Sequence, residues 1–368
     1  MSITIARKIL IVYLCTFLIS CGTKLPAKLQ VPYVENIDVE ALNANMDSQF
    51  PEMLSTEGIP GISIGIIDDF KLVLTKSYGV RSVNAQALVT DETIFEFASL
   101  SKPVFALAVL QLSEKGILDL DKPLLEYLEF RELVEDEKNK LITARIVLSH
   151  STGLPNWPDG NQIRISSIPG KEFSYSGMGY HYLQRVVEKL TGKPLQSIVE
   201  DEVFTPLMMT NSSFVWNNRF NRDKAAGHSS TGSFSRSLRE SSTGVSASSL
   251  LSTIKDYSKF LIHVLKRHQR GESIVESMVA PVTFVKSDGD WGQLFWGLGW
   301  GIEETSEGTS IWHWGNNNEF RSLVVAHLKS GIGLIYVTNS ASGLRPVSEI
   351  IQNTIGGIHP LTRFRYVH

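Results

Sequence analysis

The chain of 368 residues has two cysteines, little net charge and no motif for a phosphate or a metal ion. Its formal net charge of -3, without a long basic run or a basic–aromatic stripe, gives no reason to expect a nucleic acid as partner. No glycine-rich phosphate loop and no short-period repeat occurs, and none of the nine histidines stands in a His-Glu-x-x-His pattern. We therefore expect no metal and no other cofactor. Hydrophobic residues make up 42% and charged residues 20%, which is ordinary globular composition.

Both cysteines lie in the first 21 residues, in a segment with the pattern of an export signal. Arg7 and Lys8 precede an uncharged apolar run over residues 9–20, which is too short for a comfortable membrane span. The run ends in Leu-Ile-Ser-Cys-Gly at residues 18–22, which resembles a bacterial lipobox. The resemblance implies a signal peptide over residues 1–20, cleavage before Cys21 and acylation of its sulfur. The alternative is an ordinary buried or membrane-anchor cysteine.

This N-terminus indicates where the protein works. Residues 21–35 carry prolines and lysines without an apolar period and are typical of a tether. We expect an exported protein, lipid-anchored at the bacterial cell envelope, that touches the membrane through its anchor only. After cleavage no free thiol is left for a disulfide, so the core alone must supply stability.

The rest of the chain, residues 36–368, is predicted to be a single domain with strands at both ends and helices between. Apolar positions at helical spacing predict helices over residues 39–50, 99–112, 182–190, 257–265 and 347–355. β-branched runs predict strands over residues 61–67, 72–74, 298–302, 322–327 and 332–338. The pattern predicts an α/β (α+β) fold in which both termini build one sheet and residues 100–285, roughly, form a mainly helical insertion. The polar residues 217–243 indicate a surface loop.

Ser99 and Lys102 form a Ser-x-x-Lys motif at an expected helix start. Pro103 fits only the first turn of a helix, and residues three apart share one helix face. A serine beside a lysine that burial keeps neutral is a candidate nucleophile. An N-cap serine followed by a solvated lysine is the alternative.

Three further segments follow this motif along the chain: Leu-Ser-His-Ser-Thr-Gly-Leu-Pro at residues 148–155, Phe-Ser-Tyr-Ser-Gly at 173–177 and Trp-His-Trp-Gly at 312–315. Together with Ser99 and Lys102 they resemble the serine β-lactamase-like hydrolases, a family of class C β-lactamases, low-molecular-weight penicillin-binding proteins, D-aminopeptidases and esterases. The resemblance runs from about residue 59 to the end. It implies a β-lactamase/transpeptidase-like fold with an antiparallel sheet.

The resemblance also implies roles for individual residues. Ser99 would be the acylated nucleophile, and Lys102 and Tyr175 would shuttle its proton. The backbone N–H groups of Ser99 and Asn316 would form the oxyanion hole, where one donor is typically worth about 3 kcal/mol. Gly315 would let the substrate approach its strand closely.

Several of these residues have a structural alternative. Tyr175 would otherwise be a core aromatic, and His313 would only hydrogen-bond nearby backbone. His150 is expected to be structural. Trp296, Trp312 and Trp314 would line an apolar acyl pocket or belong to the core.

Two departures from the family pattern bear on the substrate. His313 stands where β-lactamases and penicillin-binding proteins usually have a lysine that holds a substrate carboxylate, and neutral imidazole binds carboxylate weakly. Gly177 replaces the asparagine of the Tyr-x-Asn motif, whose amide would contact a substrate amide. Arg321 would supply a substitute cation or lie on the surface.

We therefore expect a monomeric serine hydrolase that cleaves a small-molecule or peptide substrate through an acyl-enzyme. An ester or D-amino-acid amide substrate ranks above a β-lactam. The alternatives are a β-lactamase or D-alanyl-D-alanine carboxypeptidase, a non-catalytic cell-wall ligand-binding lipoprotein, and an adhesin-like lipoprotein.

Overall fold

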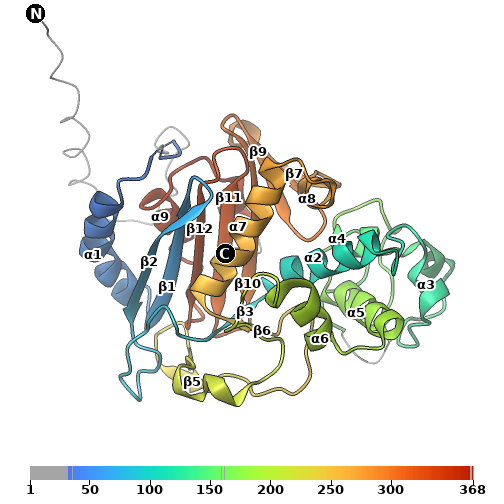
Figure 1. Ribbon diagram of the computed structural model, residues 1–368, viewed down its shortest axis with the longest axis horizontal. Coiled ribbons are helices and arrows are strands. Elements are labelled where there is room, and N and C mark those ends of the chain that lie inside the picture. Colours follow the sequence, from blue (N-terminus) through green and yellow to red (C-terminus); the bar gives the residue numbers. More distant parts are fainter. Residues whose placement is uncertain (1–31, 35, 159, 161, 365–366, 368) are drawn as a thin grey trace, which may run out of the picture.

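The computed structural model describes residues 32–34, 36–158, 160, 162–364 and 367. In this part of the chain eight strands form one antiparallel sheet in the order β2-β1-β12-β11-β10-β9-β8-β7 (Figure 1). The N-terminal hairpin pairs with the last strand, with Ile62 opposite Thr338 and Ile67 opposite Gly333. Both ends of the chain therefore build the sheet, as the sequence predicts, and all its pairs are antiparallel.

The elements have the following bounds. The strands are β1 Gly61–Asp68, β2 Lys71–Gly79, β3 Phe95–Ala98, β4 Gly227–His228, β5 Phe234–Arg236, β6 Leu250–Ser252, β7 Thr283–Ser287, β8 Gln293–Trp296, β9 Gly301–Thr305, β10 Gly308–Asn316, β11 Arg321–His327 and β12 Gly333–Thr338. The α-helices are α1 Val39–Thr56, α2 Ser101–Glu114, α3 Leu124–Tyr127, α4 Ala144–Leu148, α5 Gly177–Thr191, α6 Leu195–Val199, α7 Ile254–Gln269, α8 Ser273–Val279 and α9 Val347–Gln352. Short 3₁₀ turns cover Glu137–Leu141, Asn218–Arg222, Gly289–Trp291 and Pro360–Arg363, and a π-turn covers Glu200–Phe204.

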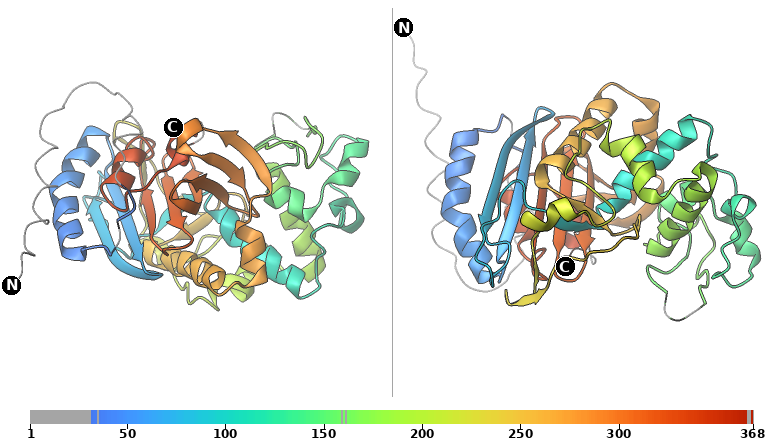
Figure 2. Two further views of the ribbon diagram at one scale, coloured as in Figure 1. Left: turned by 90° about the horizontal axis from the view of Figure 1, so that it is seen from above. Right: turned by 60° about the horizontal axis from the view of Figure 1, so that its bottom comes forward.

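Helices cover both faces of the sheet because successive strand residues point to opposite sides. One core joins α1 and α9 to one face, through residues such as Phe50, Ile64 and Tyr336. A second core joins α7 and α2 to the other face, through residues such as Phe260 and Val337. Figures 1 and 2 show the resulting layers, with the helices α2 to α6 gathered at one end of the molecule.

The predicted elements are largely present. The β1–β2 hairpin, α5, α7, β11 and β12 are confirmed, and Gly192 ends α5 with a φ of 68°. The first helix continues past Pro51 to Thr56, because the apolar side chains of Met53 and Leu54 stay on its buried face. The last helix is shorter than predicted and ends at Gln352.

Two predictions need correction. The strand predicted over residues 298–302 begins only at Gly301, since Gly299 has a φ of 98° and the N–H of Gly297 bonds to Trp300 O in a tight turn. Residues 217–243 are more than a surface loop, because they contain β4 and β5 and bury the side chain of His228. The stretch expected to be helical, residues 100–285, also contributes α7 and most of β7 to the sheet layers.

The predicted signal peptide and Cys21 lie outside the described residues. Of the predicted tether, residues 32–34 are described, and the Tyr33 hydroxyl lies 2.8 Å from Ser310 Oγ on β10. No helix in the described residues is both long and apolar enough to span a bilayer.

Candidate active site

Ser99 and Lys102 stand at the head of α2, a helix whose first turns are buried. Lys102 Nζ lies 3.1 Å from Ser99 Oγ and donates to the carbonyl of Ala247 at 2.8 Å. The lysine is 0% exposed, and this burial lowers the pKa of Lys102 from 10.5 to about 7. A large fraction of this amine is therefore neutral near pH 7, when its lone pair can accept the serine proton.

The turn before Ser99 holds an alanine in the left-handed region. Ala98 has a φ of 51°, a conformation that residues with a Cβ rarely adopt. Ser101 stabilises this turn, since its hydroxyl donates to Ala98 O at 2.6 Å and accepts from Leu250 N at 2.9 Å. The strained turn ends β3 and presents Ser99 at the start of α2.

Tyr175 is brought to the same place by the chain that enters α5. Its ring lies 4.8 Å from Lys102 Nζ, measured to the ring centroid, and only 7% of the residue is exposed. Ser176 caps α5 by accepting from Gly179 N, which fixes the backbone next to the tyrosine. The structure thus gathers Ser99, Lys102 and Tyr175 in one cluster, and their catalytic roles stay a prediction.

Two buried histidines flank this cluster. His313 Nδ1 bonds to Trp314 O at 2.7 Å, and its ring centroid lies 6.2 Å from that of Tyr175. Burial, and then the charge of Lys102, lowers the pKa of His313 well below 6.5, so the imidazole is neutral. His150 Nδ1 accepts from Ser176 N at 3.0 Å, and its structural role stays a prediction.

Gly315 lies where β10 crosses β3. A Cβ on residue 315 would stand 2.5 Å from Phe97 O and 2.1 Å from Ser322 Oγ. Atoms of β3 and β11 therefore fill the space beside this glycine. Residue 315 is glycine because the backbones of β10 and β3 come so close together. The next residue, Asn316, is exposed at the end of β10.

Gly177 also has a close neighbour. Its N–H donates to Asn156 Oδ1 at 3.0 Å, and a Cβ there would lie 2.7 Å from the backbone oxygen of Asn156. The segment around Asn156 thus occupies the space that a larger residue at 177 would need.

Arg321 lies at the start of β11, opposite Asn316 in the register. Its guanidinium donates to the carbonyl oxygens of Asn318 and Phe320. Burial lowers the pKa of Arg321 to about 10, so it stays a cation at neutral pH. The structure places this cation at the β10–β11 turn, where it binds backbone carbonyls.

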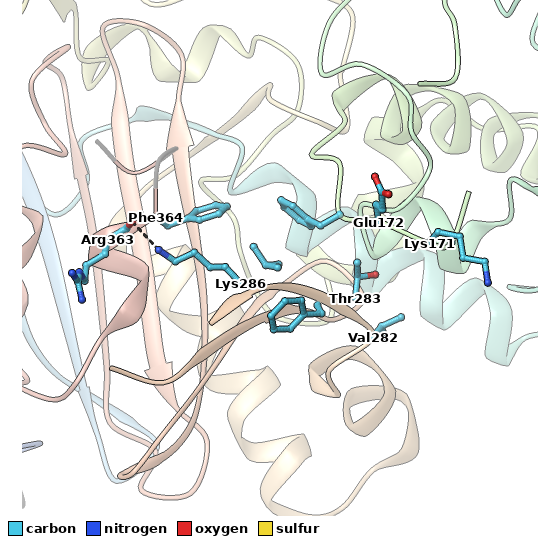
Figure 3. Close-up of a pocket in the computed structure, with 11 residues that line it drawn as sticks. Lys171, Glu172, Val282, Thr283, Lys286, Arg363 and Phe364 are labelled. Atoms are coloured by element: carbon cyan, nitrogen blue, oxygen red, sulfur yellow. Dashed lines mark hydrogen bonds between the residues drawn. The ribbon is translucent and has the colours of Figure 1, made fainter. Parts of the chain in front are cut away.

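The three tryptophans are all buried in one core cluster, which also contains Tyr175. The Trp314 ring packs 4.8 Å from the ring of Tyr175. A cavity of about 600 Å³ opens between Phe173 and β7, where Lys286 reaches the backbone oxygen of Arg363 (Figure 3). Trp296 separates this cavity from Tyr175, because its ring lies 5.4 Å from Phe173 and 5.9 Å from Tyr175.

The sequence did not predict the groups that bind Lys102 or that pair with the residues leading into Ser99. The Ala247 carbonyl binds Lys102, and backbone groups carry no sequence signal. Glu96, three residues before Ser99, pairs with Arg236 from the segment predicted to be a surface loop. Among the described residues no three His, Cys, Asp or Glu side chains are grouped as metal ligands.

The antiparallel sheet completed by both chain ends, the helices inserted after the first hairpin and the Ser-x-x-Lys at the head of a buried helix define the fold of serine β-lactamases and transpeptidases. The family described as Beta-lactamase matches residues 44–354, and the chain belongs to this family.

Relatives and solved structures agree with this assignment. The chain is 29% identical to Esterase EstB of Burkholderia gladioli over 214 residues, which cover 50% of this chain and 54% of that protein. It is 22% identical to Protein flp of Staphylococcus aureus (strain MRSA252) over 308 residues, covering 78% of this chain and 61% of that protein. The chain thus spans between one half and two thirds of these curated relatives.

Two solved structures share the fold. The octameric penicillin-binding protein homologue from Pyrococcus abyssi superposes with a TM-score of 0.72 at 24% identity, covering 86% of this chain and 77% of that one. A β-lactamase/D-alanine carboxypeptidase from Yersinia pestis, complexed with citrate, has a TM-score of 0.70 at 16% identity, covering 86% and 99%.

Proposed function

We propose that the protein is a serine hydrolase that forms an acyl-enzyme on Ser99 and acts on an ester or a D-amino-acid amide rather than on a β-lactam. The observation that carries this proposal is the pair of Lys102 Nζ and Ser99 Oγ, 3.1 Å apart, with burial lowering the pKa of the lysine to about 7. A lysine of this kind is a base near neutral pH, and a serine beside it is an activated nucleophile.

The reaction follows from this geometry. Neutral Lys102 takes the proton of Ser99, whose oxygen attacks the substrate carbonyl and forms a tetrahedral intermediate. The N–H groups of Ser99 and Asn316 bind the oxyanion. Collapse expels the alcohol or amine, which receives the proton through Lys102 and Tyr175, and water then releases the acyl group by the same steps.

The neutral charge of His313 supports an ester or amide over a β-lactam. A neutral imidazole contributes no cation for the carboxylate that a β-lactam carries. The similarity to a protein named Esterase EstB points the same way.

A fluorophosphonate probe tests the nucleophile. We expect it to label the wild type and Ser113→Ala, a serine at the far end of the same helix, and to leave Ser99→Ala unlabelled. Equal labelling of Ser99→Ala would refute the assignment. No covalent adduct with any of several acyl donors would instead favour a non-catalytic ligand-binding protein.

The substrate class needs a second measurement. Turnover of p-nitrophenyl acetate and of D-amino-acid p-nitroanilides should exceed that of nitrocefin. Fast nitrocefin turnover without ester or amide hydrolysis would instead indicate a β-lactamase or carboxypeptidase.

We also propose that Cys21 is acylated after export, on the basis of the lipobox at residues 18–22. Palmitate labelling in a bacterial host should be present in the wild type and absent in Cys21→Ala. Labelling of both proteins would overturn this proposal.

A further inference from the structure

A buried carboxylate, Glu96, ties three parts of the site together. It is 3% exposed on β3 and accepts two hydrogen bonds from the guanidinium of Arg236, at 2.7 and 3.1 Å. Its Oε2 also accepts from Asn317 Nδ2 at 2.8 Å. Charge-assisted and paired hydrogen bonds of this kind are the strongest in proteins, and burial strengthens them further.

The same network extends to the segment that holds Lys102. Asn317 Nδ2 donates to Ser248 O at 3.1 Å as well as to Glu96. Ser248 directly follows Ala247, whose carbonyl accepts from Lys102 Nζ at 2.8 Å. One amide group therefore connects β3 to the loop that orients the lysine.

Contacts with β3 also fix both sequence neighbours of Asn316. On one side of it, Gly315 packs against Phe97 O, and on the other side Asn317 bonds to Glu96. Both contacts are made with β3, the strand that leads into Ser99. The position of the Asn316 N–H relative to Ser99 is thus set from both neighbours.

We propose that Glu96 is a positioning residue for the reaction. With Arg236 and Asn317 it holds the Asn316 N–H and the Ala247 carbonyl at fixed positions relative to Ser99. This proposal rests on the proposed acyl-enzyme function. Glu96 hydrogen-bonds to Arg236 and Asn317 and acts on the site through Asn317. A displacement of about 1 Å in such a site is enough to cost roughly 100-fold in rate.

The test uses Glu96→Gln and Asn317→Ala. The glutamine keeps the shape of Glu96 but has one acceptor oxygen, so its NH₂ faces the donors of Asn317 or Arg236. Asn317→Ala removes the side-chain bonds of residue 317 to Glu96 and to Ser248 O, while leaving the Glu96–Arg236 pair and the 3.3 Å bond from Arg236 Nη2 to the backbone oxygen of residue 317. The matched control is Asp256→Asn, a carboxylate 2% exposed on α7 that pairs with Lys259 and accepts from Asn211 N.

Four quantities are measured for each full-length variant: kcat/KM and KM for p-nitrophenyl acetate, the affinity for phenylboronic acid, and the unfolding midpoint. Phenylboronic acid forms a tetrahedral adduct with the serine and so reports the oxyanion hole. For Glu96→Gln and Asn317→Ala we expect kcat/KM and boronate affinity to fall together, by roughly 10- to 100-fold, with KM within about twofold of the wild type. Asp256→Asn should lose stability only.

The outcomes separate this inference from the proposed function. If the wild type is active through Ser99 but both site variants behave like Asp256→Asn, the positioning role is wrong and the function stands. If Ser99→Ala is as active as the wild type, the proposed function fails first. Asn317→Ala keeps the test valid if Glu96→Gln does not fold.

Discussion

Gly315 on β10 lies directly against Phe97 on β3, so close that a Cβ at residue 315 would stand 2.5 Å from the Phe97 carbonyl oxygen. That oxygen already accepts a hydrogen bond from Ser322 Oγ at 2.8 Å. A backbone oxygen in a hydrogen bond cannot move aside cheaply. The contact holds the strand that leads into Ser99 against the strand that carries His313.

Gly315→Ala should therefore destabilise the protein and lower its activity. Overpacking of this kind costs about 1–3 kcal/mol, which urea unfolding followed by tryptophan fluorescence will measure. The matched control is Gly179→Ala on α5, where a Cβ would be 3.4 Å or more from its neighbours and should cause no loss. Equal unfolding free energies for the two variants would contradict the close contact.

The activity should depend on pH through Lys102. Because burial lowers the pKa of Lys102 to about 7 and the neutral amine is the base, log kcat/KM for p-nitrophenyl acetate should rise up to about pH 7 and then level off. His150 and His313 do not account for this midpoint, since burial lowers the pKa of each well below 6.5. Lys102→Arg, which stays protonated, should lose the activity. A flat profile between pH 6 and 8 would refute the role.

Lys102→Met should be inactive but more stable than the wild type at low pH. Burial lowers the pKa of Lys102 from 10.5 in the unfolded chain to about 7 in the folded protein. At any pH at which the unfolded lysine is protonated, folding must therefore either release that proton or bury the charge. This cost is fully present below pH 7 and vanishes above about pH 10.5. From the two pKa values we expect a gain of about 5 kcal/mol at pH 6 that shrinks to about 2 kcal/mol at pH 9.

Guanidinium unfolding at the two pH values measures this difference. The exposed Lys193→Met serves as control and should change stability by no more than about 0.5 kcal/mol at either pH. A Lys102→Met variant less stable than the wild type at pH 6 would show that the lysine is not desolvated.

An asparagine at residue 177, as in the Tyr-x-Asn motif, should not confer β-lactam turnover. Gly177→Asn places a Cβ 2.7 Å from the Asn156 backbone oxygen, so the turn before α5 must shift and Tyr175 with it. We expect lower ester turnover and no increase in nitrocefin turnover, in assays run side by side. Increased nitrocefin turnover with unchanged stability would show that the site accepts the side chain.

The sequence predicted the elements whose signals are local. The hairpin β1–β2 follows from β-branched runs, the helices α5 and α7 follow from apolar periodicity, and the end of α5 follows from Gly192. The edge strand β7 and its neighbour β8 were missed, because they are short and their residues alternate irregularly between buried and exposed.

The site was predictable only as far as its motifs extend. The order of Ser99, Lys102 and Tyr175 along the chain was enough to expect one cluster, and the structure places them together. The contact of Glu96 with Arg236 joins residues 140 positions apart and has no local signature. The same holds for the Asn156 oxygen beside Gly177 and for the Ala247 carbonyl that binds Lys102.

The pairing of β1 with β12 has a consequence for how the protein is made. Residues 62–67 find their partner strand only at residues 333–338, so the centre of the sheet waits until nearly the whole chain has been synthesised. Contacts of such long sequence separation form slowly. Throughout synthesis the apolar hairpin is an open edge, and a chain cut short before residue 333 has no strand to close it. In the newly made chain, β1 therefore stays without its β12 partner until the last strand of the sheet has been synthesised.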